Sequence, residues 1–332
     1  MNAQSPDRAT LAAFIGIVVL GGFNGISITF SNEELPPFWG ATVRFGIASA
    51  LLFGLVALRR VALPRGPALI GSVVYGLLGF GLTYACAYTA IAGTGAALAQ
   101  VLLTLVPLVT LIFAVAVGLE RFRAQGVVGT LIAAAGIIVV FGDRLATDVP
   151  LLPVLIVLAG AAAIAAASVV VKRFPHGHPL ATNAVAMGVG ALLLLALSVA
   201  AGEQPALPTE PSTLAAVAYL VIFGSIVVFM LYLFVIERWT ASATSYSLLA
   251  MPLVTVPAAA LIRNEPITLA LVAGGALVLA GVYVGAFAPS ISRPLPGLFR
   301  RPLAPGTSPA SAAGAGAAAG EGPPALVSPN CP

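Results

Sequence analysis

The sequence predicts an all-α membrane protein whose ten transmembrane helices form two inverted five-helix repeats. Three observations predict this fold. First, 60% of the 332 residues are hydrophobic and only 8% are charged, whereas a soluble domain carries about 25% charged residues. Second, apolar runs of about 20 residues recur along the chain, and each is long enough to cross about 30 Å of hydrocarbon. Third, residues 76–142 align on residues 221–287 at a constant offset of 145 without a gap.

The predicted spans are separated by short breaks that carry proline, glycine or charge, such as residues 33–37 and the pair Arg59-Arg60. The first span follows Arg8. At about 21 residues it is longer than the 7–15-residue apolar core of a signal peptide, which favours a retained helix. In chain order, the spans are predicted at residues 10–30, 38–58, 67–90, 95–118, 125–142, 152–171, 180–201, 212–236, 241–262 and 268–287.

The loop charges predict the orientation of these spans. Cytoplasmic loops carry an excess of lysine and arginine. If residues 1–9 are a cytoplasmic N-terminus, the inner loops hold Arg8, Arg59, Arg60, Arg65, Arg121, Arg123, Lys172, Arg173, Arg238, Arg293, Arg300 and Arg301, and the outer loops hold only Arg144 and Arg263. The outer loops instead carry Glu33, Glu34, Asp143, Asp148, Glu203, Glu210 and Glu265. Both termini are therefore predicted to be cytoplasmic, and the basic pI of about 9.4 is no sign of a nucleic-acid partner.

Residues 288–332 differ in composition from the rest. Ten of these 45 residues are proline and six are glycine. Such a segment has too little bulky apolar surface to offset the entropy lost on ordering. We expect a disordered cytoplasmic tail.

The scarce polar residues exclude several activities. Lys172 is the only lysine, so the phosphate-binding loop GxxxxGK[ST] is absent. The only histidines, His176 and His178, share one loop without the ligands that a zinc site needs. Cys86 and Cys331 form neither a disulfide framework nor a redox motif. We expect no metal, no cofactor and no enzymatic activity.

The internal repeat is the strongest functional signal. At the offset of 145, residues 106–110 (VPLVT) fall on residues 251–255 (MPLVT). Glu120 then falls on Glu265, Gly129 on Gly274 and Gly136 on Gly281. Five spans is an odd number, so the second copy crosses the membrane upside down. Inverted repeats of this kind build many secondary transporters, whose substrate site lies near mid-membrane between the halves.

These residues resemble the EamA group of the drug/metabolite transporter superfamily. The resemblance spans residues 10–287 and is carried by Asn24, by Arg44-Phe45, and by the pattern Pro107, Glu120, Gly129, Gly136 repeated as Pro252, Glu265, Gly274, Gly281. It implies one five-helix repeat over residues 10–142 and a second, inverted one over residues 152–287. It also implies export of small metabolites, often amino acids, across the bacterial inner (plasma) membrane.

Arg44 is the most informative single residue. It lies about six residues, or roughly 9 Å, inside the second span. An arginine within a span costs at least about 2.5–3.5 kcal/mol, so its side chain should face the bundle interior or water. A carboxylate-bearing substrate would supply the negative charge and the hydrogen-bond acceptors that the guanidinium lacks, because a guanidinium binds carboxylates bidentately. The other interpretation is a snorkelling or structural arginine that ties helix ends together through backbone carbonyls.

Other polar residues at comparable depth should also point inward, because polar groups in hydrocarbon need partners. They contact the substrate, or else they serve helix packing or an interfacial aromatic belt. The candidates for substrate binding, besides Arg44, are Asn24, Tyr84, Tyr88, Gln100, Thr104, Tyr232, Ser245 and Tyr246.

The duplicated residues Pro107 and Pro252, with Glu120 and Glu265, predict a shared structural or gating task. For the two glutamates we expect pairing with nearby arginines, Arg121 and Arg123 in the case of Glu120 and Arg263 in the case of Glu265. Proton relays in membranes use ionisable residues deep in the spans. Apart from Arg44, which cannot release its proton, the predicted spans carry none at depth. Facilitated diffusion or exchange is therefore favoured over proton coupling.

The leading hypothesis is a secondary transporter that exports amino acids or related carboxylate-bearing solutes without ATP hydrolysis. An exporter of hydrophobic drugs or lipid-linked substrates is the alternative within transport, and a non-transporting membrane scaffold is the alternative of another class. The expected partners are a small-molecule substrate and the lipid bilayer. A monomer is favoured, and a homodimer is left open.

Overall fold

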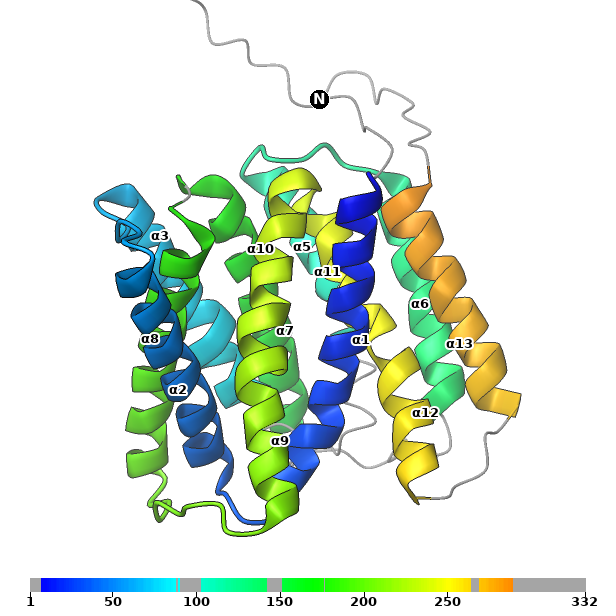
Figure 1. The fold of residues 1–332 in the computed structure, drawn as a ribbon. Helices are drawn as coiled ribbons and strands as arrows, with labels where there is room; N and C mark the ends of the chain where they lie inside the picture. Colours follow the sequence, from blue (N-terminus) through cyan, green and yellow to red (C-terminus); the bar gives the residue numbers. More distant parts are fainter. Residues whose placement is uncertain are drawn as a thin grey trace, which may run out of the picture. The chain divides into compact units, whose positions relative to one another are not determined.

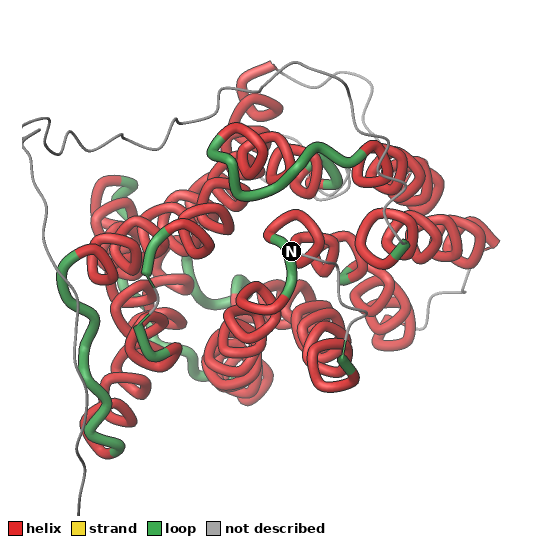
Figure 2. Tube along the Cα trace, turned by 90° about the horizontal axis from the view of Figure 1, so that it is seen from above, coloured by secondary structure: helices red, strands yellow, loops and turns green. Residues whose placement is uncertain are grey.

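The computed structural model describes residues 7–87, 89, 103–141, 151–175, 177–263 and 269–288. Within them all regular secondary structure is helical, and there is no β-strand (Figure 1). The same helices are seen from above in Figure 2. The elements are α1 (Arg8–Ser31), α2 (Pro37–Leu58), α3 (Pro67–Tyr75), η1 (Gly76–Leu82), α5 (Val106–Ala116), α6 (Ala124–Phe141), α7 (Leu151–Arg173), α8 (Pro179–Ala200), α9 (Pro211–Val221), η3 (Ile222–Val227), α10 (Val228–Arg238), α11 (Ala241–Ala250), α12 (Pro252–Arg263), α13 (Leu269–Val282) and η4 (Tyr283–Phe287), where η denotes a π-helix.

The predicted all-α membrane fold is confirmed. Seven helical segments of the described residues are long and apolar enough to cross a bilayer. Each of the ten predicted spans has a helical counterpart, and α5 represents the described part of the fourth. The predicted tail from residue 289 onward lies outside the described residues.

The ninth span differs from the prediction of one continuous helix over residues 241–262. It consists of α11 and α12, which are separated at Met251. Pro252 is the physical reason, because proline has no N–H to continue the helical hydrogen bonds and its ring crowds the preceding turn. Pro252 therefore stands at the first position of α12, where the missing N–H costs nothing.

Two π-helical segments occupy corresponding positions in the two halves. η1 follows α3 in the third span, and η3 joins α9 to α10 in the eighth. The offset of 145 places residues 76–82 on residues 221–227, so the irregularity itself is duplicated. A π-helical turn bonds each carbonyl one residue further along the chain, and such turns often occur at functional sites.

The packing of α6 against α13 shows the symmetry that relates the two halves. A methyl group added to Gly136 would lie 2.6 Å from the carbonyl oxygen of Gly274, and one added to Gly281 would lie 2.6 Å from that of Gly129. Since Gly129 corresponds to Gly274 and Gly136 to Gly281, the same contact is made twice. A contact repeated in this reciprocal way is the signature of a two-fold relation. α6 and α13 lie side by side in Figure 1.

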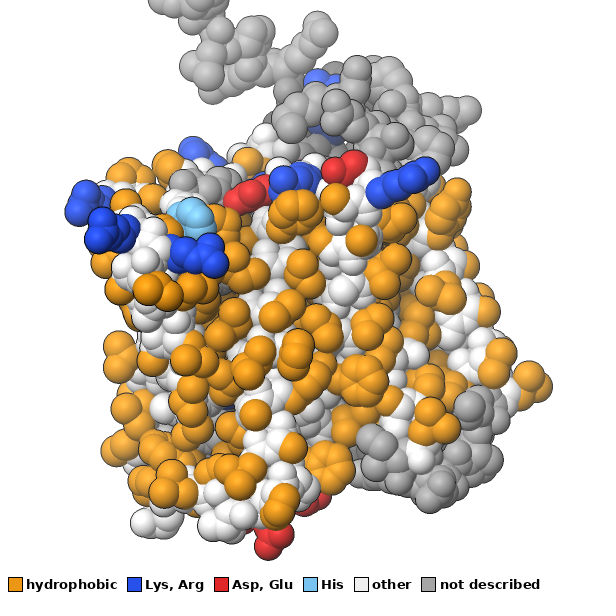
Figure 3. Space-filling view, viewed as in Figure 1, with side chains coloured by type: hydrophobic (Ala, Val, Ile, Leu, Met, Phe, Trp, Pro, Cys, Tyr) orange, Lys and Arg blue, Asp and Glu red, His pale blue; other side chains and the backbone are white. Residues whose placement is uncertain are grey.

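The two ends of the helices carry different charges. The end at which α1 begins, here called the basic end, carries the arginines of the described loops; the opposite, acidic end carries Glu33, Glu34, Glu203 and Glu210 (Figure 3). At the acidic end, Glu34 accepts hydrogen bonds from the Thr209 hydroxyl (2.5 Å) and the Glu210 N–H (3.1 Å) at the start of α9. Glu203 accepts from the Trp39 N–H (2.7 Å) at the start of α2. Each half thus caps a helix of the other.

The Glu34 contact should make stability depend on pH. The hydrogen bonds from Thr209 and Glu210 hold the pKa of Glu34 below its ordinary value. A lowered pKa means that the stabilisation is complete above the pKa of the unfolded chain and is lost as pH falls through that of the folded one. We expect Glu34→Gln to lower the melting temperature at neutral pH. The gap to wild type should close on acidification below about pH 4.

Thermal melting between pH 3 and 8 tests this expectation, with Glu33→Gln as the matched control on the neighbouring acid. A melting-temperature gap for Glu34→Gln that stays constant over this range would contradict it.

Candidate functional site

Arg44 forms the centre of a polar cluster inside the bundle. Its side chain is only 2% exposed. The guanidinium crosses from α2 to the π-helical segment η3, where Nε donates to the Ser225 hydroxyl (2.8 Å) and Nη2 donates to the Gly224 carbonyl (2.8 Å). Gly224 lies near the middle of the long span formed by α9, η3 and α10, so the first and second halves meet at this cluster.

Asn24 of α1 joins the same cluster. Its Nδ2 donates to the Gly224 carbonyl (3.2 Å), which therefore accepts from two side chains. Because a carbonyl can only accept, the amide nitrogen faces the Gly224 oxygen, and the Asn24 oxygen lies beside the Gly224 Cα. Gly224 is required for this approach, since a methyl group there would overlap the Asn24 oxygen.

The cluster leaves one donor group and one acceptor group unused. The Arg44 Nη1 and the Asn24 Oδ1 are buried and have no hydrogen-bond partner. Buried polar groups are almost always paired, and an unpaired charged donor is especially costly. A ligand with an anionic acceptor and a hydrogen-bond donor would therefore pair with both groups.

Aromatic rings compensate part of the buried charge. The Arg44 guanidinium carbon lies 4.8 Å from the centroid of the Phe45 ring and 5.4 Å from that of Tyr84. Cation–π contacts of this kind contribute about 0.5–2 kcal/mol. The other contacts described for Arg44 are with neutral groups, Ser225 and Gly224. A cation surrounded in this way attracts an anion strongly, because low polarity strengthens charge interactions.

The corresponding place in the other half is apolar. Gly79 corresponds to Gly224 at the offset of 145. A methyl group on Gly79 would lie 3.1 Å from the ring of Tyr75 and 3.3 Å from the Cβ of Ala167. Ala167 thus occupies the place beside Gly79 that the Asn24 amide occupies beside Gly224. The polar cluster is therefore present in only one of the two repeats.

Side chains of the second half hold the part of α1 that precedes Asn24. The Tyr219 hydroxyl donates to the Leu20 carbonyl (2.9 Å), and the Thr255 hydroxyl donates to the Gly22 carbonyl (2.6 Å). Glycines also allow α12 to approach closely, since a methyl group on Gly25 would lie 3.0 Å from Thr255. These contacts position the Asn24 amide.

The structure brings together three of the predicted site residues, Asn24, Arg44 and Tyr84, and places the others elsewhere. The Tyr232 hydroxyl contacts Ser168 (2.6 Å) and ties α10 to α7. The Tyr246 hydroxyl donates to the Gly126 carbonyl (2.6 Å) and ties α11 to α6. Ser245 bonds within α11, and Pro252 begins α12. Thr104 and Pro107 are buried at the start of α5. The other predicted residues, Tyr88, Gln100 and Glu265, lie outside the described residues.

The expected pairing of Glu120 with Arg121 or Arg123 is wrong. The Glu120 carboxylate accepts from the N–H (3.0 Å) and the hydroxyl of Ser242, at the start of α11. Arg123 instead reaches the Thr240 hydroxyl (3.4 Å). The unpaired N–H groups at a helix start attract a carboxylate and position it there. Glu120 thus links the first half to the second at the basic end.

Gly224 and Ser225 are the site residues that sequence reasoning missed. A weak signal was present, because Gly224 matches Gly79 at the repeat offset and Ser225 is a polar residue within an apolar run. Glycine and serine are common in membrane helices for packing alone, so neither stands out. Within the described residues, no three His, Cys, Asp or Glu side chains gather as a metal site requires.

Comparisons with known proteins agree with this architecture. A match to the EamA-like transporter family covers residues 8–142 and 151–286. The chain is similar to YedA, an uncharacterized inner membrane transporter of Escherichia coli (strain K12), with 30% identity over 241 residues, or 71% of this chain and 77% of YedA. It is 24% identical to a probable amino-acid metabolite efflux pump of Salmonella typhimurium, over 82% of this chain and 92% of that protein. A solved crystal structure shares the fold, with a TM-score of 0.72 at 22% identity over 84% of this chain and 96% of that one.

Proposed function

Because the chain belongs to the EamA-like transporter family, we propose that it exports small carboxylate-bearing solutes, amino acids foremost, by alternating access without ATP hydrolysis. The cluster around Arg44 is the substrate site. The carboxylate binds the free Arg44 Nη1, and the ammonium group binds the free Asn24 Oδ1. The name of the Salmonella typhimurium relative, which refers to amino-acid metabolites, supports the same class of solute.

The single observation that carries this proposal is the unpaired donor and acceptor beside Gly224. A zwitterion offers an anionic acceptor and a cationic donor on neighbouring atoms, which matches this pair. A hydrogen bond in which one partner is charged contributes about 1.5–3 kcal/mol. The carboxylate bond to Arg44 and the ammonium bond to Asn24 are therefore together enough to select such a solute. A purely hydrophobic ligand would leave both protein groups unpaired.

Alternating access follows from the location of the site. Both free groups are buried, so a solute reaches them only when the two halves move apart on one side. Glu34 and Glu203 join the halves at the acidic end, and Glu120 joins them at the basic end. These contacts are candidates for the outer and inner gates. In the proposed orientation the basic end faces the cytoplasm, as the positive-inside rule requires.

The chemistry around Arg44 favours exchange without proton coupling. Its described contacts are serine, a backbone carbonyl and two aromatic rings. An arginine does not release its proton at physiological pH. A solute can therefore bind and leave without a titration step at the site.

Counterflow into proteoliposomes tests the proposal. Vesicles are preloaded with an unlabelled amino acid, a monocarboxylate, an alkylamine or a lipophilic cation, and uptake of the labelled solute is followed with and without a pH gradient. We expect the amino acid to exchange fastest, the monocarboxylate next, and neither to need the gradient. Flux of lipophilic cations alone would overturn the substrate class and favour a drug exporter. Strict dependence on the gradient would overturn the uncoupled mechanism, and no flux of any solute would favour a scaffold.

Gly224→Ala is expected to lower amino-acid counterflow by about tenfold with little loss of stability. The added methyl group displaces the Asn24 amide, a flexible side chain that moves at low cost but then misses the substrate. One lost hydrogen bond corresponds to about this factor. Gly79→Ala is the matched control at the corresponding position of the other repeat and should keep most of the activity. Equal losses in the two variants would contradict a specific role for Gly224.

A further inference from the structure

Two tyrosines inside the bundle, Tyr75 and Tyr232, lie between Arg44 and the basic end. Tyr75 is the last residue of α3, about eight residues, or roughly 12 Å, from the start of that helix at the basic end. Tyr232 lies about six residues, or roughly 9 Å, before α10 ends there. Arg44 is about 14 residues, or roughly 21 Å, from the same end of α2. Both tyrosines are therefore on the basic side of the Arg44 cluster.

The Tyr75 hydroxyl is buried and has no hydrogen-bond partner among the described residues. The side chain is only 3% exposed. Its ring packs edge-on against Phe80 (5.2 Å between centroids), and Phe80 packs in the same way against Phe45, the ring beside the Arg44 guanidinium. Aromatic rings thus join Tyr75 to the Arg44 cluster. A buried hydroxyl that is left unpaired destabilises a protein, so Tyr75 holds a donor that is available to a solute.

The Tyr232 oxygen is available as an acceptor. The Tyr232 hydroxyl lies 2.6 Å from that of Ser168 in α7. The Ser168 hydroxyl has one proton, which it donates to the Ile164 carbonyl (2.9 Å). Tyr232 is therefore the donor in its contact with Ser168, and the lone pairs of its own oxygen stay available.

The two tyrosines belong to one packed group. Both take part in the hydrophobic cluster that α2, α3, α7, α8 and α10 form. A methyl group on Gly79 of η1 would lie 3.1 Å from the Tyr75 ring and 3.3 Å from the Cβ of Ala167. Ala167 directly precedes Ser168, the partner of Tyr232. The donor and the acceptor thus face the same part of the bundle interior.

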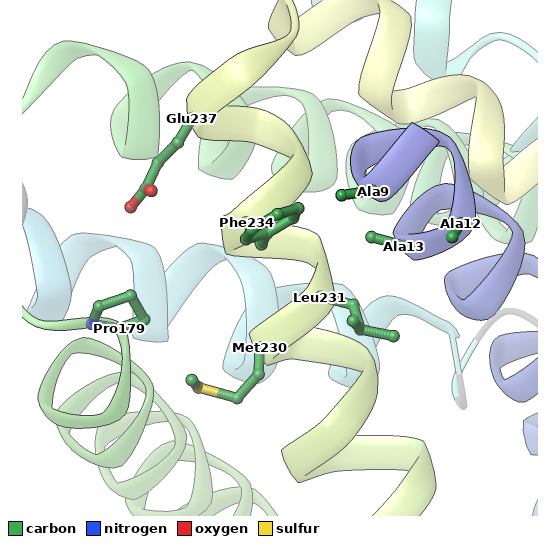
Figure 4. A pocket seen from close by; sticks show the side chains of 8 residues that line it. All are labelled: Ala9, Ala12, Ala13, Pro179, Met230, Leu231, Phe234 and Glu237. Carbon is green, nitrogen blue, oxygen red and sulfur yellow. The ribbon is translucent and has the colours of Figure 1, made fainter. Parts of the chain in front are cut away.

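α10 separates this pair from a cavity at the basic end. The cavity has a volume of about 500 Å³, and Figure 4 shows Met230, Leu231 and Phe234 of α10 beside it. Tyr232 lies on the opposite face of α10, where it contacts α7. Of the described residues that line the cavity, only Glu237 is polar. The cavity therefore offers a carboxylate no donor side chain, whereas the tyrosine pair offers one.

We propose that Tyr75 and Tyr232 form a second solute site, through which the solute passes between the basic end and Arg44. The solute carboxylate accepts from the Tyr75 hydroxyl, and its ammonium group donates to the Tyr232 oxygen. The pair thus repeats the donor and the acceptor that Arg44 and Asn24 offer. This inference rests on the proposed transport of amino acids and related solutes.

The second site binds the solute more weakly than the first. The ionisable groups that act on Tyr75 are neutral tyrosines, Tyr232 and Tyr84. Hydrogen bonds from neutral donors are weaker than those from a guanidinium. The solute is therefore held briefly at the tyrosines and more tightly at Arg44. It reaches the tyrosines when the two halves part at the basic end, where Glu120 joins them.

Tyr75→Phe tests the site, because it removes the unpaired hydroxyl and keeps the ring. We expect the KM of amino-acid counterflow to rise by about fivefold to tenfold, the effect of one hydrogen bond. The melting temperature should stay the same or rise, since no hydrogen bond within the protein is lost. Tyr283→Phe, at an exposed tyrosine of η4, is the matched control and should change neither quantity.

The outcomes separate this site from the proposed function. Amino-acid exchange by wild type with the same KM in Tyr75→Phe would overturn the second site alone. A raised KM together with a lower melting temperature would mark a packing defect and would also overturn it. No amino-acid exchange by wild type would overturn the proposed solute class, and the second site with it.

Cysteine labelling tests the location of the site. Tyr75→Cys is made in a chain that carries Cys86→Ala and Cys331→Ala, and inside-out and right-side-out vesicles are treated with a membrane-impermeant maleimide. We expect labelling from the face at which Arg59→Cys is labelled, which marks the basic end, and slower labelling when an amino acid is present. Ser49→Cys, buried between α2 and α8, should resist the reagent from both faces. Labelling of Tyr75→Cys from neither face, or from the acidic end alone, would overturn the second site.

Discussion

Replacing Arg44 with glutamine is expected to reduce counterflow of an amino acid by about 10- to 100-fold per folded molecule. The guanidinium Nη1 is the unpaired donor to which we assign the substrate carboxylate. A hydrogen bond between charged groups contributes about 1.5–3 kcal/mol, which corresponds to that range of affinity. Arg44→Lys should also transport poorly. The compact ammonium group lacks the planar arrangement of donors with which a guanidinium binds Ser225, Gly224 and a carboxylate at the same time.

The same variants separate the substrate role of Arg44 from its structural role. Loss of the bonds to Ser225 and Gly224 also destabilises the contact between the halves, so both variants should melt at lower temperature. Rates are therefore compared on protein that elutes as folded, and KM is measured together with the maximal rate. Arg59→Gln, at the exposed end of α2, is the control. A folded Arg44→Gln protein with wild-type KM and rate would leave Arg44 as a purely structural tie.

Gly281→Ala is expected to lower the free energy of unfolding by about 1–3 kcal/mol. The new methyl group would lie 2.6 Å from the Gly129 carbonyl oxygen and 2.7 Å from the Cβ of Ala133, so α13 must move away from α6. Overpacking of a close contact typically costs this amount. Because Gly129 and Gly281 are part of the reciprocal contact between the repeats, the displacement acts on both halves.

Gly54→Ala is the matched control for this effect. Gly54 also lies within a membrane helix, but a methyl group there meets nothing within 4 Å. It should leave stability unchanged or raise it by up to about 1 kcal/mol, since alanine favours the helix more than glycine does. Reversible unfolding in detergent measures both variants. Equal effects at Gly54 and Gly281 would show that helix propensity, rather than close packing, decides the result.

Most of the fold could be predicted because its causes are local in the sequence. The second span was expected at residues 38–58 and is observed as α2 over Pro37–Leu58; the seventh was expected at 180–201 and is observed as α8 over Pro179–Ala200. A run of apolar residues partitions into the bilayer whatever its neighbours are. The break at Met251 was missed, although Pro252 marks it, because a proline in a long apolar run is also compatible with a kinked but continuous helix.

The candidate site could be predicted only in part. Asn24, Arg44 and Tyr84 were found because a polar group in an apolar run needs a partner. The partner that Asn24 and Arg44 share, the Gly224 carbonyl, becomes available through the π-helical turn of η3 and the absence of a side chain at that glycine. Tyr232 and Tyr246 look equivalent to Tyr84 in sequence, yet the structure binds their hydroxyls to Ser168 and Gly126.

The sequence alone determined the class of this protein: a ten-span membrane transporter built by inverted duplication, with its basic loops at one end. Hydropathy, charge and a repeat offset are properties of short segments, and each can be read without knowing which helices touch. Tertiary structure decided which of the two repeats carries a polar centre and what Arg44 leaves unpaired. It also decided that Glu120 caps a helix of the other half instead of joining a neighbouring arginine. Hydrogen-bond partners more than 100 residues apart depend on how the two halves pack, and no local pattern records that.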